Sequence, residues 1–462
     1  MSVTDPSQSS SAEPFISGSV RRRTIVAASA GNFVEWYAAG VYGIVAVALS
    51  KQLFPAGTSP TIALINTYAV FAVSYLLRPV GGIVFGHIAD RLSRKQALSV
   101  TIIITCLATG LIGVIPVYRL IGWYAPILLL VLRLVQSMGT GGEYSAAISF
   151  VYEHGRRGRK ATAVGQAASL TFVGLLVGAL ASTILSGLMP AAAYQSYGWR
   201  ILFLLAVPMG LVGWYLRRRT EEGPEFQALQ RMRTAEKSTI PLVESLRRYW
   251  ARIVVFIFFL GSWAVIGTLL TNYLPTFLDS NKSLSQTESN AANLLASFMV
   301  VVFVLAYSPF MDRIGLRKAM IIACIVLIVG IIPGFALAGS GLVTGFLGAA
   351  IIGICKGVLA VPALLSMSQL FPVDIRVTSG GLAYNMSASI LGGTAPVIAV
   401  WLNSAFGNSL VFSSYIIFYG LLTLVITLIC AKKWVAESAA HSGDVGAATG
   451  AGSIAPAPSR AI

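Results

Sequence analysis

Three ionisable side chains, Glu35, Arg133 and Lys356, stand deep inside long apolar segments of the chain. A charged side chain inside a membrane span costs at least about 2.5–3.5 kcal/mol on insertion scales, so such residues are functional candidates by default. A carboxylate can bind and release a proton, and an arginine or a lysine can bind an anion. These residue types therefore indicate a site for protons and a small charged solute. A structural ion pair and a snorkelling lysine are the alternatives.

The overall composition indicates that lipid, rather than water, surrounds most of the chain. Hydrophobic residues make up 56% and charged residues 11% of the 462 residues, and the mean hydropathy is +0.78. A soluble domain carries about 25% charged residues. The net charge of +16 comes from short basic clusters between apolar runs, which is typical of membrane-protein loops and not of a nucleic-acid interface. Because the four cysteines and three histidines are scattered, neither a metal site nor a disulfide is expected.

Apolar segments of about 20 residues, the length that crosses a bilayer, recur along the chain. We place twelve of them, near residues 24–50, 61–88, 97–117, 124–151, 161–189, 199–216, 252–278, 290–311, 318–338, 342–370, 377–403 and 410–431. The prediction is an all-α integral membrane protein made of an N-terminal cytoplasmic tail (1–23), a six-helix bundle (24–216), a cytoplasmic linker (217–251), a second six-helix bundle (252–432) and a disordered cytoplasmic tail (433–462).

The lysines and arginines outside the spans are distributed unequally between the two predicted sides. Twenty-six fall on the side of both termini, and four fall on the other side: Lys51, Arg119, Arg200 and Lys282. Cytoplasmic loops carry the excess of basic residues. We therefore expect a multi-pass protein of the cell membrane (inner or plasma membrane) with both termini in the cytoplasm.

A short motif recurs at the equivalent place of each half. Asp90-Arg91-Leu-Ser-Arg94-Lys follows the second span and Asp312-Arg313-Ile-Gly-Leu-Arg-Lys follows the eighth, with the two aspartates 222 residues apart. Two repeated six-helix halves are a transporter architecture with the binding site at their interface. A carboxylate at a helix end can meet the positive N-terminus of a neighbouring helix. We therefore predict a gating role for these five residues, with an ordinary basic loop as the alternative.

Several further segments carry a family resemblance. They are Gly31-Asn-Phe-Val-Glu35-Trp36-Tyr37 in the first span, Leu77-Arg78-Pro79 in the second, Arg133-Leu-Val-Gln136 with Gly141-Gly-Glu143-Tyr144 in the fourth, and Gly198-Trp199-Arg200 entering the sixth. In this combination the chain resembles the major facilitator superfamily over roughly residues 24–432, in particular its metabolite:proton symporter family. That family includes proline/betaine, 2-oxoglutarate, citrate, shikimate and aromatic-acid carriers. The resemblance implies the major facilitator fold, two pseudo-symmetric six-helix bundles.

In that superfamily the first, fourth, seventh and tenth spans line a central cavity, so the resemblance implies that Glu35 and Arg133 face each other. Glu35 lies about eleven residues into its span, roughly 16 Å deep at 1.5 Å per residue. A solute carboxylate that captured the arginine would favour protonation of Glu35 and so couple the two ligands. We predict Glu35, Arg133 and Glu143 as proton-coupling residues. A structural pair remains open for Glu35, as does a loop partnership for Glu143, and Arg78 is expected to order helix packing.

One departure from the family lies at position 38. Members usually carry an acidic residue directly after the Glu-Trp-aromatic triplet, where this chain has Ala38. Lys356, in the tenth span, lies one residue from the repeat equivalent of Arg133. The cavity is therefore expected to be net positive and to take an anion.

Other predicted substrate contacts come from the first and seventh spans. With Arg133 and Lys356, they are Trp36, Tyr42, Asn272 and Tyr273. Aromatic rings can also enclose a quaternary ammonium, which keeps a betaine-like zwitterion open as the substrate.

These observations predict a secondary active transporter that takes up a small organic acid (a carboxylate or dicarboxylate), or a related zwitterion, together with protons by alternating access. A proline/betaine-type osmolyte symporter and a non-transporting sensor of the same fold are the alternatives, the sensor because of Ala38. No enzyme is expected, since the sequence shows no nucleophile–base constellation and no phosphate-binding loop. The expected partners are the solute, protons and the lipid bilayer. No nucleic acid and no cofactor beyond the proton gradient are predicted, and we expect a monomer.

Overall fold

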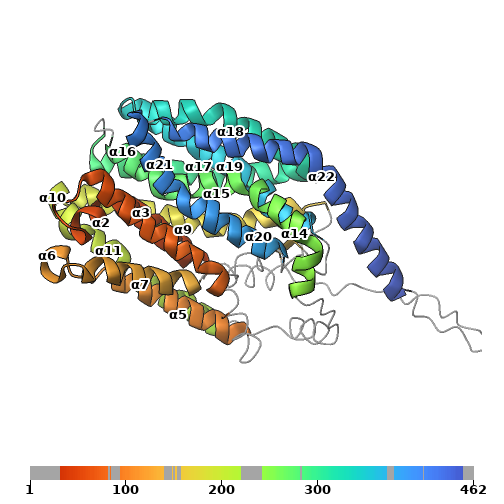
Figure 1. Ribbon diagram of the computed structural model, residues 1–462, viewed down its shortest axis with the longest axis horizontal. Helices are drawn as coiled ribbons and strands as arrows, with labels where there is room; N and C mark the ends of the chain where they lie inside the picture. Colours follow the sequence, from red (N-terminus) through yellow and green to blue (C-terminus); the bar gives the residue numbers. More distant parts are fainter. Residues whose placement is uncertain are drawn as a thin grey trace, which may run out of the picture.

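The computed structural model describes residues 32–81, 84, 94–139, 148, 151–152, 158–219, 242–280, 284–371, 379–408 and 410–450. Helices make up nearly all of this part of the chain and lie side by side in an elongated bundle (Figure 1). Among the described residues, nine helices are long and apolar enough to cross a membrane. A tenth span is a bent helix pair, and two shorter apolar helices complete the set. The twelve predicted spans therefore have their counterparts in the structure.

The first half of the chain supplies six of these spans. The first is a pair of helices, Asn32–Ile44 and α2 (Ala46–Leu53), bent by 64° at their junction. There follow α3 (Pro60–Leu76), α5 (Arg94–Ile112), the short α6 (Tyr118–Ile121), α7 (Tyr124–Gly139) and α9 (Lys160–Leu188). The sixth span joins α10 (Ala191–Ala193), the π-helix η1 (Tyr194–Gly198), α11 (Trp199–Leu204) and α12 (Ala206–Arg219).

The second half repeats this arrangement. Its first span joins α14 (Leu242–Phe259), α15 (Gly261–Thr268), the π-helix η2 (Leu269–Tyr273) and α16 (Leu274–Ser280). There follow α17 (Gln286–Ile314), α18 (Leu316–Ala338) and α19 (Leu342–Gln369). The last two spans are α20 (Gly381–Met386) with the π-helix η4 (Ser387–Gly392) and α21 (Gly393–Phe406), and then α22 (Phe412–Gly450).

The outward faces of these helices are apolar. Val329, Val343 and Ile429 are 68%, 72% and 70% exposed. Soluble monomers rarely expose large contiguous apolar patches, whereas in a bilayer such faces lie against lipid. A helix also satisfies its backbone hydrogen bonds internally, as lipid requires. The chain is therefore a multi-pass membrane protein, as its composition predicted.

Two pairs of long helices join the halves. α17 packs along α9, and α21 packs along α3. Within the halves, α5 packs against α7 and α12, while α18 packs against α19 and α22. Figure 1 shows α5 and α7 along one edge of the bundle and α18 and α22 along the opposite edge. The predicted linker, 217–251, lies mostly outside the described residues, since α12 ends at Arg219 and α14 begins at Leu242.

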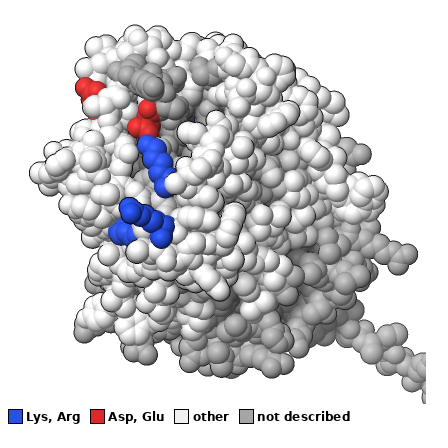
Figure 2. All heavy atoms as spheres, turned by 60° about the vertical axis from the view of Figure 1, so that its left-hand side comes forward, with Lys and Arg blue, Asp and Glu red and all other residues white. Residues whose placement is uncertain are grey.

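Basic residues lie at both ends of the bundle. One end, here called the α2 end, carries Lys51 in α2, Arg119 in α6 and Arg200 in α11. Figure 2 turns this end forward and shows a few charged side chains on a surface that is otherwise uncharged over its described part. The other end, here called the basic end, is where α9 begins at Lys160 and α17 ends beside Arg313. Most of the basic loop residues that the sequence assigns to this end lie outside the described residues, so the asymmetry of the loops stays a prediction.

α22 extends well beyond the predicted last span. The apolar part of this helix is Phe412–Cys430, but the helix itself runs to Gly450 and projects from the bundle (Figure 1). The expectation of disorder from residue 433 onward is thus corrected for residues 433–450, which are helical. The segment is rich in alanine, the best helix former. Because the helix is already nucleated within the membrane, extending it requires no new nucleus.

Candidate functional site

A central cavity lies between the two halves. The space in it that no protein atom fills, including the part open to solvent, is ≈ 470 Å³. The first half contributes residues from the helix Asn32–Ile44 and from the α3 span, and the second half contributes residues from α15, η2, α19, α20 and η4. The lining residues that carry polar or aromatic groups are Glu35, Trp36, Tyr75, Arg78, Trp263, Thr268, Thr271, Asn272, Lys356 and Tyr384. The interface between the halves, where the repeat predicted a binding site, is therefore where the charged residues meet.

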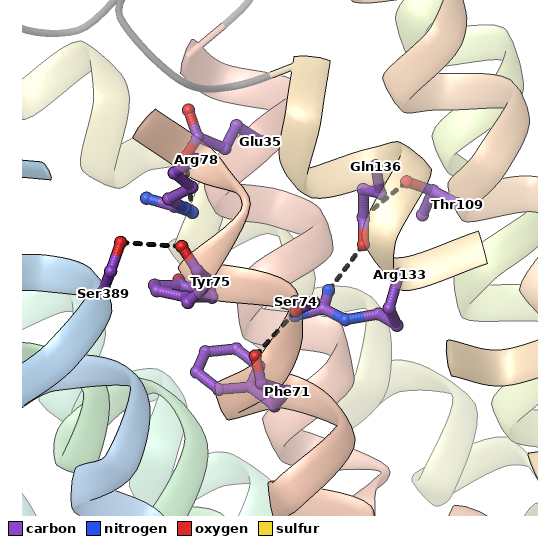
Figure 3. Close-up of polar contacts among 9 residues, drawn as sticks. All are labelled: Glu35, Phe71, Ser74, Tyr75, Arg78, Thr109, Arg133, Gln136 and Ser389. Atoms are coloured by element: carbon purple, nitrogen blue, oxygen red, sulfur yellow. Dashed lines mark hydrogen bonds and ion pairs between the residues drawn. The ribbon is translucent and has the colours of Figure 1, made fainter. Parts of the chain in front are cut away.

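Glu35 forms an ion pair with Arg78 at one side of this cavity. Its Oε1 lies 2.8 Å from Nη2 of Arg78, and the guanidinium lies 3.8 Å from the centre of the Tyr75 ring (Figure 3). The prediction that Glu35 faces Arg133 is corrected to this extent: both line an adjoining smaller cavity, but the carboxylate pairs with Arg78. Arg78, which the sequence assigned to helix packing, is therefore a member of the site.

Arg133 is turned toward its own bundle. It is 4% exposed, its Nη1 donates to Oε1 of Gln136 at 2.5 Å, and Nε2 of Gln136 donates to Oγ1 of Thr109 at 2.7 Å. Its guanidinium lies 4.3 Å from the centre of the Tyr42 ring and 4.9 Å from that of Phe71. Figure 3 shows the hydrogen bonds from Arg133 through Gln136 to Thr109, and the Phe71 ring, beside the Glu35 pair. Among the described residues, Arg133 has a neutral amide and aromatic rings around it instead of a carboxylate.

Lys356 enters the cavity from the middle of α19. It is 2% exposed, and its Nζ lies 3.0 Å from the centre of the Trp263 ring and 3.4 Å from the carbonyl oxygen of Trp263. A Cβ atom at Gly267 would come within 2.5 Å of this Nζ, so the missing side chain there makes room for the ammonium. No acidic side chain of the described residues forms an ion pair with Lys356. The cavity thus holds a basic side chain with which a bound anion could form an ion pair.

The predicted aromatic and amide contacts divide into two groups. Trp36 and Asn272 line the cavity. The hydroxyl of Tyr273 instead accepts a hydrogen bond from Nδ2 of Asn403 at 2.7 Å. Tyr42 donates to the carbonyl oxygen of Thr67 at 2.7 Å. Neither tyrosine is among the described residues that line the cavity. The ring of Tyr42 instead makes a cation–π contact with Arg133.

Sequence reasoning missed several contributors to the site, among them Arg78, Tyr75, Tyr384 and Thr268. Arg78 could have been found by the criterion used for Arg133, because it too is a charge inside an apolar run. Tyr75 and Tyr384 carry no such signal, since tyrosines are common in membrane spans. Thr268 lies one turn from Asn272, but hydropathy alone does not say which face of a helix meets a cavity.

The gating motif of the second half makes the predicted helix-end contact. Oδ1 of Asp312 accepts from the backbone N–H of Ala161 at 2.8 Å, and Oδ2 accepts from the backbone N–H and the hydroxyl of Thr162 at 2.9 and 2.5 Å. Asp312 at the end of α17 thereby caps α9 of the other half, where a helix N-terminus attracts negative charge.

The remaining members of the predicted gating and coupling set are less fully described. Asp90, Arg91 and Glu143 lie outside the described residues. Arg94 begins α5, with its side chain likewise outside them, and Arg313 lies in the last turn of α17. Their predicted roles stay predictions.

Replacing Asp312 with asparagine should loosen the basic end. The change removes the charge that the α9 N-terminus favours. We expect the state in which α17 and α9 are in contact at this end to be destabilised by about 1–3 kcal/mol, which lowers its equilibrium constant roughly 5–150-fold. Ser308, one turn earlier on α17 and 1% exposed, reports on this if it is replaced with cysteine in a background without the native cysteines. Maleimide should label that cysteine faster in the Asp312→Asn protein. Thr162→Val, which removes one of the three bonds, should have a smaller effect, and equal labelling rates in all three proteins would contradict the gating role.

The chain is similar to known proteins over most of its length. The model of the Major Facilitator Superfamily matches residues 28–307. The proline/betaine transporter of Escherichia coli (strain K12) is 32% identical over 421 residues, which cover 87% of this chain and 82% of that protein. The glycine betaine/proline/ectoine/pipecolic acid transporter OusA of Dickeya dadantii (strain 3937) is 32% identical over 392 residues, which cover 82% and 77%. Among solved structures, a partially occluded inward open conformation of the xylose transporter XylE from E. coli matches with a TM-score of 0.69 at 16% identity, covering 90% and 98%.

These similarities agree with the fold and with the motifs. The structural match has low sequence identity and supports the twelve-span, two-bundle architecture. The sequence relatives extend over both halves, and they confirm that the chain is a transporter and not an enzyme. The chain belongs to the major facilitator superfamily, in its metabolite:proton symporter family, and is a multi-pass secondary transporter.

Proposed function

We propose that this transporter takes up a small organic acid together with protons by rocking of its two bundles about the central cavity. The observation that carries the proposal is the buried ammonium of Lys356, which has no acidic partner among the described residues. An uncompensated charge inside a membrane protein is costly, and a carboxylate that enters the cavity would neutralise it. Arg133 adds a second positive charge beside the cavity, with Gln136 as its hydrogen-bond partner.

A zwitterion such as proline or betaine is the second candidate substrate. The relatives are named as transporters of proline, betaine, ectoine and pipecolic acid. In addition, the cavity is lined by the rings of Trp36, Tyr75, Trp263 and Tyr384, and aromatic faces attract cationic groups. Both candidates carry a carboxylate, so the role of Lys356 is the same for each.

In this proposal Glu35 is the group that carries the proton. The ion pair with Arg78 keeps its carboxylate ionised while the cavity is empty. A solute carboxylate that attracted Arg78 would weaken this pair, and Glu35 would then take up a proton more readily. The position that is usually acidic in the family is the buried Ala38, so the role falls to Glu35. Binding of solute and proton would thus favour each other without a cofactor.

The proposal also includes an orientation in the membrane and an oligomeric state. We place the basic end and both termini in the cytoplasm, because the excess of lysine and arginine lies there, and we propose a monomer. A cysteine introduced at Lys432 should react with an impermeant maleimide only after the cells are opened. Reaction in intact cells would contradict this orientation.

Uptake by the purified protein in liposomes with an alkaline interior tests the proposed function. The panel contains radiolabelled mono-, di- and tricarboxylates, aromatic acids, proline and betaine. We expect accumulation of one carboxylate-bearing solute above its external concentration, and loss of this accumulation on addition of a protonophore. Binding without accumulation would contradict the proposal and would favour a sensor or an exchanger.

A further inference from the structure

We propose that the cavity selects solutes that carry an N–H or O–H donor in addition to their carboxylate, and that Asn272 accepts the hydrogen bond from this donor. The preferred class is then an amino, imino or hydroxy acid, rather than a fully methylated betaine or a plain carboxylate. This inference rests on the proposed carboxylate site at Lys356 and narrows the class of solute that binds there.

Most of the hydrogen-bond donors of the α15–η2 wall of the cavity are already used. Oγ1 of Thr268 donates to the carbonyl oxygen of Ala264 at 3.1 Å, and Oγ1 of Thr271 donates to that of Gly267 at 2.8 Å. Nδ2 of Asn272 donates to the carbonyl oxygen of Thr268 at 3.3 Å. These three side chains line the cavity. Apart from the second N–H of the Asn272 amide, what they can still offer a solute is acceptor oxygens.

One of these acceptors has no partner. Asn272 is 1% exposed, and its Oδ1 accepts no hydrogen bond from the described residues. The bond from Nδ2 to a carbonyl oxygen fixes which atom of the amide is the oxygen, since a carbonyl can only accept. Buried polar atoms in native proteins almost always have a partner. A donor on the bound solute would supply the missing one.

The backbone of Asn272 is held against the first half of the protein. Tyr68 of α3 donates to the backbone carbonyl of Asn272 at 2.6 Å. A side chain at Gly43 would overlap with the backbone of Thr271 and Asn272, so the first span lies directly against η2. η2 is a π-helix, Leu269–Tyr273, and single π turns occur frequently at functional sites because they change which side chains face inward. Asn272 therefore cannot readily turn away to find another partner.

The two sides of the cavity thus differ in the hydrogen-bonding groups that they offer a solute. Lys356 supplies donors for a carboxylate, while the α15–η2 wall supplies mainly acceptors, among them the unpartnered Oδ1 of Asn272. A solute with a carboxylate and a donor satisfies both sides at once. A quaternary ammonium could still lie against the aromatic rings, but it would leave Oδ1 of Asn272 without a partner.

Two matched pairs of solutes test this inference by calorimetric binding to the purified protein. Proline and N,N-dimethylproline differ in their N–H groups, and malate and succinate differ in one hydroxyl. We expect the donor-bearing member of at least one pair to bind about tenfold or more tightly than its partner, because a site built to hydrogen-bond a group rejects the analogue that lacks it. Equal binding within both pairs, tighter binding of the analogue, or no binding of any of the four would overturn the inference.

Substitution of Asn272 assigns the effect to this residue. Asn272→Leu should weaken binding of the donor-bearing solute about tenfold and leave binding of its analogue nearly unchanged, so that the preference disappears. Asn403→Leu is the control, because Asn403 bonds to Tyr273 on the side away from the cavity, and it should retain the preference. A preference that survives Asn272→Leu would overturn the inference. Donor preference without proton-driven accumulation would contradict the proposed transport instead, and accumulation without donor preference would contradict the role of Asn272 alone.

Discussion

Replacing Lys356 with methionine should abolish most uptake of carboxylate-bearing solutes. Removing one partner of a buried charge pair costs about 2–5 kcal/mol, which is roughly 30-fold to several thousand-fold in kcat/KM at 1.4 kcal/mol per factor of ten. Uptake of uncharged analogues, such as the methyl ester or the amide, should fall much less, because these solutes do not form an ion pair with Lys356. Lys356→Ala should act in the same direction. The measurement is uptake of both kinds of solute by the variant in liposomes.

The same substitution should make the protein more stable to heat. The ammonium of Lys356 is 2% exposed and has no acidic partner among the described residues, so it destabilises the empty protein. Methionine is of similar length and carries no charge, and replacing buried charges by apolar groups is often stabilising by about 1–4 kcal/mol. Lys51→Met at the α2 end is the control and should leave uptake and melting temperature unchanged. Equal loss of transport for anions and neutral analogues would exclude the cationic site.

Replacing Glu35 with glutamine should abolish proton-driven accumulation and leave exchange of solute across the membrane. Glutamine has the shape of glutamate and can still accept a hydrogen bond from Arg78, but it cannot carry a proton between the two sides. Internal solute should then rise only to the external concentration when a proton gradient is imposed. Counterflow in preloaded liposomes, which needs no net proton movement, should continue. Comparing the two assays on the same vesicles measures the effect.

Two further variants make the Glu35 result interpretable. Glu288→Gln alters a carboxylate that caps α17 through the backbone N–H of Ser285 at 2.7 Å, outside the cavity, and it should accumulate solute normally. Glu35→Gln leaves Arg78 as a buried unpaired charge, which is destabilising. If the single variant folds poorly, the double variant with Arg78→Gln removes that charge and should restore folding without restoring accumulation. Unchanged accumulation in Glu35→Gln would remove Glu35 from the coupling role.

Much of the architecture could be predicted from the sequence because lipid imposes a simple condition. Every span must be an apolar helix of about 20 residues, and this makes the twelve spans and their division into halves visible in hydropathy and loop charge. The cost of burying a charge likewise makes Glu35, Arg133 and Lys356 conspicuous. The repeated aspartate motif predicted the contact that Asp312 makes with α9.

The partners of these residues could be decided only by the tertiary structure. Glu35 pairs with Arg78 instead of Arg133, Lys356 lies over Trp263, and Tyr42 and Tyr273 turn away from the cavity that Asn272 enters. Each of these facts depends on how far a helix is rotated and tilted against its neighbours. Hydropathy does not determine rotation or tilt, because packing against other helices sets both. The sequence by itself therefore determined that Glu35, Arg133 and Lys356 lie within apolar helices, whereas helix packing decided which groups they meet.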